Sequence, residues 1–294
     1  MKETYPEYRV EPFELGDSES KVGCLLFHGY TGSPLDLFPV AKICEKYGWH
    51  VRAVRLPGHG RPIEELIKVK HTDWLRAAEK EYEEFAKNKE RVILVGHSLG
   101  NVLIFHLDVK YREEKKITNL VSISPPVVIR KGWMLPFVGL AKIFVRHIDY
   151  SEIAFKDKKI MQHPLYDYLR FTYKKFPLGI IKELGKAVEY GVKLVPLLET
   201  DVIVLFGKED DVVDPLSGYE ILMKAKSRHK SLVMLEGMHV PMLDIDYKAF
   251  QESLISYFNG ISEKKLGFED TFDIFDLFDE AARITNIALG KLKG

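Results

Sequence analysis

The sequence has few of the features that direct a chain to a membrane, to nucleic acid or to an oxidising compartment. Its 294 residues include two cysteines, Cys24 and Cys44, and both fall in predicted core elements, so we expect buried thiols and no disulfide. The 43 basic residues equal the 43 acidic ones, which gives no argument for a nucleic-acid partner. No run of 18 apolar residues and no signal-peptide-like stretch occurs. We therefore expect a soluble, cytoplasmic protein without a transmembrane segment.

Short apolar runs are plentiful, and over the first 124 residues they alternate with helical patterns. These runs have four to six residues with no polar alternation, which is typical of parallel strands buried on both faces. The pattern predicts an α/β fold whose mostly parallel sheet is covered by helices on both faces. The predicted strands are 8–15, 21–27, 49–54, 92–95, 120–123, 202–206 and 231–235, and the predicted helices include 34–47, 72–87, 216–226 and 247–258.

One stretch carries a strong chemical signal, a buried strand that ends in a very tight turn around a serine. The run Val92 to Val95 ends at Gly96-His97-Ser98-Leu99-Gly100, and helical spacing begins directly behind it. Glycines two residues before and two residues after Ser98 allow the turn to close with the hydroxyl at its apex. The helix behind the serine directs its first N–H groups and its dipole toward negative charge at that point. The stretch therefore predicts a nucleophile, against the alternative of a structural turn serine.

A serine hydroxyl needs a base to take its proton and an acid to orient that base. In enzymes with this turn, the acid and then the histidine follow the serine, each on a loop after a later strand. Asp210 lies on the loop after the penultimate predicted strand, and His239 lies on the loop after the last one. We predict Ser98, Asp210 and His239 as the catalytic residues. Asp211 and Asp214, on the same loop as Asp210, are alternatives for the acid.

The tetrahedral oxyanion that forms during acyl transfer needs two backbone N–H donors. One is expected from Leu99, the residue after the nucleophile, and the other from Tyr30, on the loop after the strand 21–27. Gly29 and Gly32 allow that loop to pass close to the substrate carbonyl. The residues that bind the rest of the substrate are not predicted.

Four histidines on neighbouring loops, His28, His59, His97 and His239, raise the question of a metal site. None has the H-x-H, H-E-x-x-H or cysteine-pair spacing of common metal sites. We therefore expect no metal and no cofactor. His28 and His97 are expected to be structural residues that hold their loops through side-chain hydrogen bonds.

Two segments depart from the alternating pattern. The connection 125–200 is far longer than the dozen or more residues that a crossover needs, and it contains many aromatic residues between Trp133 and Phe176. We predict a small helical cap there, whose aromatic residues form its own core or line a pocket. The segment 261–294 predicts a helix that is apolar on two sides, packed on its own core or forming a homodimer contact. The predicted domains are the core, 1–124 and 201–260, the cap, 125–200, and the C-terminal helical extension, 261–294.

Six motifs resemble, in their order, those of α/β-hydrolase carboxylesterases. The nearest group is formed by bacterial monoacylglycerol lipases and related small-cap carboxylesterases, and the resemblance covers residues 21–124 and 200–258. One departure is Arg61-Pro62, where many relatives have a small polar residue. The motifs are His28-Gly29-Tyr30-Thr31-Gly32-Ser33-Pro34, Leu56-Pro57-Gly58-His59-Gly60, His71-Thr72-Asp73-Trp74, Gly96-His97-Ser98-Leu99-Gly100, Glu209-Asp210-Asp211-Val212-Val213 and His239-Val240-Pro241-Met242-Leu243-Asp244.

The resemblance implies an α/β-hydrolase fold and a metal-free mechanism through an acyl-enzyme. It also implies Ser98, Asp210 and His239 as the triad, with the N–H groups of Tyr30 and Leu99 as the oxyanion hole. The expected function is hydrolysis of carboxylic esters, with short or medium acyl chains or monoacylglycerols as substrates. Acyl transfer and thioester, amide or carbon–carbon hydrolysis are alternatives, because the same triad serves all of them. A non-catalytic hydrolase-fold protein is a further alternative, which an intact triad disfavours.

Overall fold

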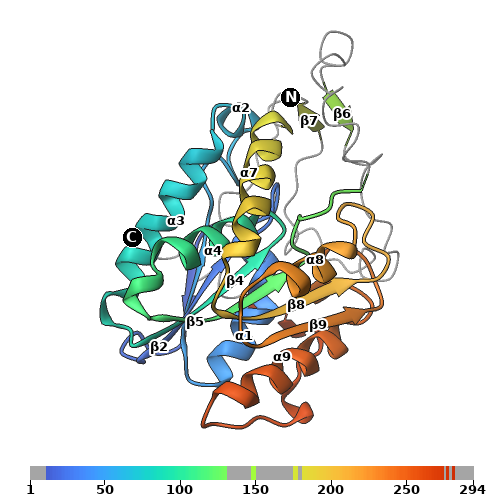
Figure 1. The fold of residues 1–294 in the computed structure, drawn as a ribbon. Coiled ribbons are helices and arrows are strands. Elements are labelled where there is room, and N and C mark those ends of the chain that lie inside the picture. The colour runs from blue at the N-terminus through green and yellow to red at the C-terminus, as the bar shows by residue number, and fades with distance from the viewer. Residues whose placement is uncertain are drawn as a thin grey trace, which may run out of the picture.

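A seven-stranded sheet forms the centre of the structure, which is a computed structural model and describes residues 11–130, 147–149, 175–177, 181–274, 276–277 and 280–281 (Figure 1). The strand order is β1-β3-β2-β4-β5-β8-β9. Only the edge strand β1 is antiparallel to its neighbour, so the predicted, mostly parallel sheet is confirmed. The strands are β1 (Phe13–Leu15), β2 (Val22–Phe27), β3 (His50–Val54), β4 (Arg91–His97), β5 (Ile117–Ile123), β8 (Asp201–Gly207) and β9 (Lys230–Leu235).

Helices cover both faces of this sheet (Figure 1). Helices α3, α4, α7 and α8 pack on one face, and α1 and α9 pack on the other. Within the described residues, no helix combines the length and apolar character needed to cross a bilayer. The helices are α1 (Phe38–Lys46), α2 (Ile63–Leu66), α3 (His71–Phe85), α4 (Leu99–Lys110), α7 (Ile181–Leu194), α8 (Leu216–Lys224) and α9 (Tyr247–Ile261).

The unbroken apolar runs of the central strands follow from burial on both faces. In β4, Val92 and Leu94 point into the core beneath α3 and α4, whereas Ile93 and Val95 point into the core beneath α1 and α9. Successive side chains of a strand alternate between the two faces, so an apolar residue is needed at every position. The sheet therefore has one hydrophobic core on each face, and polar side chains for chemistry are expected on the loops that follow its strands.

The two cysteines lie together in the core beneath α1 and α9. Cys24 on β2 and Cys44 on α1 are fully buried and free. Burial raises the pKa of the Cys24 thiol well above its ordinary value, and the neighbouring Cys44 adds to this effect. Both residues are therefore small hydrophobic core residues, which confirms the expectation of no disulfide.

The connection between β5 and β8 contains strands that the helical prediction did not include. β6 (His147–Asp149) and β7 (Lys175–Pro177) pair antiparallel. At the end of this connection, α7 packs so closely on α4 that a Cβ atom at Gly191 would lie 2.8 Å from Val102 Cγ2. Apart from Phe176 in β7, the aromatic residues predicted for this cap lie outside the described residues, so the inserted cap and its boundaries stay a prediction.

The segment after α9 folds back on the core. Ile274, Leu277 and Ala281 are buried against α1 and α9, as the alternative of packing on the chain's own core requires. The fully buried Gln251 of α9 anchors this segment, because its Oε1 accepts the Phe272 N–H at 2.7 Å and its Nε2 donates to the Phe272 carbonyl at 3.1 Å. A dimer contact is not shown, and residues 282–294 lie outside the described part of the chain.

Replacing Gln251 should loosen this segment. We expect Gln251→Ala to lower the free energy of unfolding by about 1–3 kcal/mol, because the Phe272 backbone groups lose their buried partners. Urea titration followed by fluorescence measures the loss, with Ser256→Ala on the exposed side of α9 as the control. Equal midpoints for the Gln251 variant and the unmodified protein would contradict an anchoring role.

Candidate active site

Ser98 stands between β4 and α4 in a backbone conformation that is rare for any residue except glycine. Its φ is 48° and its ψ is −115°. Such a conformation costs about 1–3 kcal/mol and persists only where the surroundings enforce it. Ser98 is partly exposed, whereas His97 before it and Leu99 after it are buried. The structure therefore places the predicted nucleophile at the apex of a strained turn with its side chain accessible.

The glycines around Ser98 are required by close backbone contacts. A Cβ atom at Gly96 would lie 2.7 Å from the Asn101 nitrogen and the Gly100 carbonyl oxygen. A Cβ atom at Gly100 would lie 2.0 Å from the carbonyl oxygen of Phe27. The turn is thus pressed against the end of β2, where the next loop of the site begins.

His239 and Asp210 meet at the carboxyl ends of β9 and β8. His239 Nδ1 lies 2.8 Å from Asp210 Oδ2, and both side chains are buried. The other carboxylate oxygen, Oδ1, accepts the backbone N–H groups of Val212 and Val213, each at 2.9 Å. A carboxylate held in this way fixes the imidazole with its proton on Nδ1, so that Nε2 is the basic nitrogen.

The electrostatics of this pair favour a charged carboxylate. Burial alone would raise the pKa of Asp210, but the charge and hydrogen bond of His239, with the two backbone N–H groups, hold that pKa below its ordinary value. The two alternative acids, Asp211 and Asp214, do not have this environment. Asp211 is exposed, and Asp214 Oδ1 accepts the Leu216 N–H at 3.0 Å at the start of α8. Asp210 is therefore the carboxylate that the structure brings to His239.

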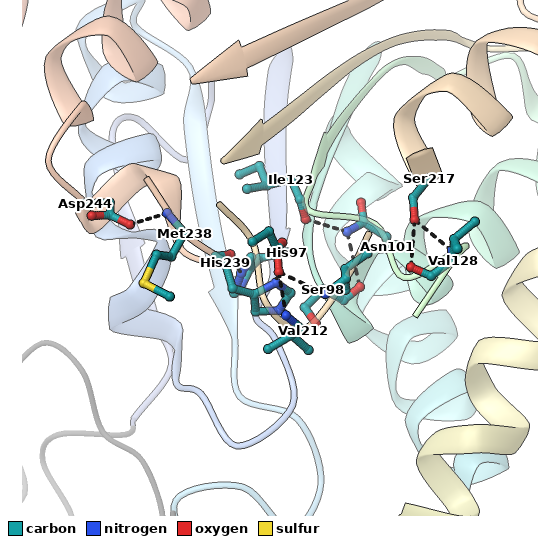
Figure 2. A network of polar contacts seen from close by, with 12 residues as sticks. His97, Ser98, Asn101, Ile123, Val128, Val212, Ser217, Met238, His239 and Asp244 are labelled. Atoms are coloured by element: carbon teal, nitrogen blue, oxygen red, sulfur yellow. Dashed lines mark hydrogen bonds and ion pairs between the residues drawn. The ribbon is translucent and has the colours of Figure 1, made fainter. Parts of the chain in front are cut away.

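Two further side chains, those of His97 and Asp244, fix the loop that carries His239 (Figure 2). His97 Nε2 donates to the His239 carbonyl at 2.9 Å, and the two imidazole centroids are 5.1 Å apart, which holds His239 beside the residue that precedes Ser98. The buried Asp244 accepts the Met238 N–H at 2.5 Å and the Ile245 N–H at 2.7 Å. The sequence assigned no role to Asp244, although it ends the last of the six motifs.

The loop after β2 lies directly against the serine turn. A Cβ atom at Gly29 would lie 3.2 Å from Ser98 Cβ and 2.8 Å from His97 Nδ1. The Gly29 carbonyl accepts the Gly32 N–H at 3.1 Å, which closes the loop around Tyr30. Tyr30 and Leu99, the two predicted oxyanion donors, therefore lie on segments that meet at Ser98.

His28 links this loop to the loop after β3. Its Nδ1 donates to the Gly29 carbonyl at 2.8 Å, and its Nε2 accepts the Leu56 N–H at 3.2 Å. Both contacts together require the neutral ring with its proton on Nδ1. Burial and the neighbouring His59 keep the pKa of His28 well below its ordinary value. These contacts fit a structural residue and leave no nitrogen for catalysis.

His59 packs behind Tyr30 as a neutral ring. Its centroid lies 5.0 Å from that of His28 and 5.7 Å from that of Tyr30. Its Nδ1 donates to the Pro57 carbonyl at 3.2 Å, and burial lowers its pKa to about 4. Among the described residues, no cluster of three or more histidine, cysteine or acidic side chains is placed to hold a metal ion.

A comparison with known protein families finds a match to most of this chain. The profile described as "Serine aminopeptidase, S33", named Hydrolase_4, matches residues 18–246, which is well over half of the chain. The chain belongs to the Hydrolase_4 family. The residues of this site, from Phe27 to Ile245, lie within the Hydrolase_4 match, whereas the segment after α9 lies beyond it.

Two curated relatives and one solved structure are similar to this chain. The thermostable monoacylglycerol lipase of Bacillus sp. (strain H-257) is 26% identical over 267 residues, which are 88% of this chain and 98% of that protein. The carboxylesterase of Bacillus subtilis (strain 168) is 24% identical over 80% of this chain and 90% of that protein. A structure described with two metagenome-derived lipolytic enzymes has a TM-score of 0.74 at 22% identity, covering 85% of this chain and 98% of that chain. The predicted α/β-hydrolase fold is thereby confirmed.

Burial of the neutral His59 ring should make the folded protein sensitive to acid. The unfolded chain binds a proton at this histidine from about pH 6.5 downward, whereas the folded protein binds it only near pH 4. The unfolded state thus holds more protons in this range, so stability falls as the pH decreases from about 6.5 to 4. The difference between these two pKa values corresponds to about 3 kcal/mol of folding stability.

We expect His59→Gln to lose about 3 kcal/mol less stability than the unmodified protein between pH 6.5 and pH 4. Urea titrations at several pH values measure this, with each protein compared with its own value at pH 7. Parallel pH curves for the His59 variant and the unmodified protein would contradict the assignment of a neutral, buried ring.

Proposed function

We propose that the protein is a serine hydrolase that cleaves carboxylic esters through an acyl-enzyme, with Ser98 as nucleophile, His239 as base and Asp210 as orienting acid. The single observation that carries this proposal is the 2.8 Å contact between His239 Nδ1 and Asp210 Oδ2 on loops that converge on the strained Ser98 turn. Two relatives named as a monoacylglycerol lipase and a carboxylesterase support the same reaction class.

The reaction proceeds in two steps. Nε2 of His239 removes the hydroxyl proton of Ser98 as its oxygen attacks the ester carbonyl, and the imidazolium then gives this proton to the leaving alcohol. Water attacks the resulting acyl-Ser98, with His239 again as the base, and releases the acid. Asp210 stays ionised throughout and stabilises the imidazolium, as its lowered pKa requires.

The backbone N–H groups of Leu99 and Tyr30 serve as the oxyanion hole in this proposal. Leu99 N–H lies at the start of α4, where the helix dipole is positive. The Tyr30 N–H belongs to the loop that Gly29 brings against the Ser98 side chain. Preorganised donors of this kind stabilise the charge that develops on the carbonyl oxygen and cost no reorganisation during the reaction.

The substrate in this proposal is an ester with a short or medium acyl chain, or a monoacylglycerol. The support comes from the named relatives and from the predicted apolar cap. Amide hydrolysis is the second candidate, because the matching family is described as a serine aminopeptidase family. Turnover of p-nitrophenyl esters of increasing chain length, monoacylglycerols and aminoacyl p-nitroanilides separates the two candidates.

Removing the nucleophile should abolish the reaction. We expect Ser98→Ala to lower kcat on a p-nitrophenyl ester by about 10⁴-fold or more, because no other group forms the acyl-enzyme. A fluorophosphonate probe should label the unmodified protein and fail to label this variant. The exposed Ser256→Ala is the control and should keep full activity. Normal ester turnover by Ser98→Ala would refute the mechanism.

The identity of the acid is testable by a matched pair of variants on one loop. We expect Asp210→Asn to lower kcat by about 10⁴-fold, because the amide favours the wrong tautomer of His239. Asp214→Asn should keep kcat, since that carboxylate accepts the Leu216 N–H at the start of α8. Steady-state kinetics on the same ester measure both. A large loss in the Asp214 variant and none in the Asp210 variant would reassign the acid.

A further inference from the structure

Asn101 contacts the nucleophile turn through its side chain as well as its backbone (Figure 2). It is the third residue of α4 and is fully buried on a helix whose neighbouring residues, Val102 to Phe105, are apolar. A buried amide in such surroundings needs specific hydrogen-bond partners. Its Nδ2 donates to the Ser98 carbonyl at 3.1 Å and to the Ile123 carbonyl at 2.7 Å.

The two hydrogen bonds of Asn101 Nδ2 link the N–H and the carbonyl group of the Ser98 backbone to each other. The Ile123 carbonyl at the end of β5 also accepts the Ser98 N–H at 3.0 Å. The Ser98 carbonyl in turn also accepts the Asn101 backbone N–H at 2.9 Å. The Asn101 amide therefore closes a ring of hydrogen bonds from the Ser98 N–H, through Ile123, back to the Ser98 carbonyl.

The orientation of the amide is determined by its surroundings. Two carbonyl oxygens face one end of the amide and accept only from its nitrogen. At the other end, Ser122 on β5 donates its hydroxyl proton to Asn101 Oδ1 at 2.6 Å, and Ser122 is fully buried as well. All three partners require the same placement of Nδ2 and Oδ1, so the amide has a single orientation.

The bond to the Ser98 carbonyl acts on the oxyanion donor. This carbonyl and the Leu99 N–H belong to the same peptide group, and in a planar trans peptide they point in opposite directions. Two donors from Asn101 hold the carbonyl on the inner side of the turn. The Leu99 N–H is thereby aimed away from Asn101, on the outer side of the same peptide plane.

We propose that Asn101 is a positioning residue for the reaction, and that its side-chain amide, oriented by Ser122, fixes the Ser98–Leu99 peptide and thereby aims the oxyanion donor. This inference rests on the proposed function, because it assigns Leu99 N–H to the oxyanion. A donor that is misaligned loses contact with the transition state more than with the bound ester. The consequence of losing the amide is therefore a lower kcat at a similar KM.

The test compares Asn101→Ala with Asn119→Ala. Asn119 lies on β5 like Ser122, is also buried, and donates to the Tyr257 hydroxyl at 2.9 Å. We expect Asn101→Ala to lower kcat by about 100-fold with KM nearly unchanged. Asn119→Ala should keep kcat, although we expect its melting temperature to fall by about as much as that of Asn101→Ala. Assays are run well below both melting temperatures, and the rate of fluorophosphonate labelling is measured alongside.

Ser122→Ala supplies a second measurement that keeps the asparagine. We expect an intermediate loss of kcat in this variant and no further loss when it is combined with Asn101→Ala, because Ser122 acts through the amide. If Asn101→Ala does not fold, the kcat of Ser122→Ala alone still tests the proposal.

Three outcomes overturn the proposal: unchanged kcat in both the Asn101 and Ser122 variants, equal kcat losses in the Asn101 and Asn119 variants, or additive losses in the double variant. Failure of the proposed function gives a different result, since the unmodified protein itself would then neither turn over esters nor react with the phosphonate.

Discussion

The backbone conformation of Ser98 is the constraint on which the site depends. A positive φ at a residue with a side chain is costly, and the turn is held by close packing of Gly100 against the end of β2 and by hydrogen bonds to the end of β5. Strain of this kind survives only in a rigid frame. The two-sided core provides that frame, because β2, β4 and β5 are central strands buried on both faces.

The same parallel arrangement explains why the polar residues meet. Parallel strands deliver their following loops to one edge of the sheet, and the loops after β2, β4, β8 and β9 carry Tyr30, Ser98, Asp210 and His239. Contacts between loops then set the finer geometry. Imidazole groups make two of these contacts. His28 joins the loops after β2 and β3, and His97, the last residue of β4, holds the loop after β9.

Much of this arrangement is predictable from the sequence, since burial on both faces produces continuous apolar strands and polar residues follow their ends. Those positions bring the loop after β8 to His239, whereas the choice of Asp210 over Asp211 and Asp214 needs the structure. The pairing of β6 with β7 is not predictable in this way, because such short strands have no marked pattern. The role of Asn101 depends on the register between β4 and β5, which the sequence does not give. The sequence shows only that a polar amide lies within an otherwise apolar helix.

The short antiparallel strand β1 has a consequence for how this sheet meets other molecules. It ends the sheet after three residues, and its Glu14 forms an ion pair with Arg52 and a hydrogen bond with His50, both on β3. Sheet edges that are short and charged are poor templates for an incoming strand. Intermolecular strand addition is therefore disfavoured along β1, and the protein is shielded there from the edge-to-edge association that leads to aggregation.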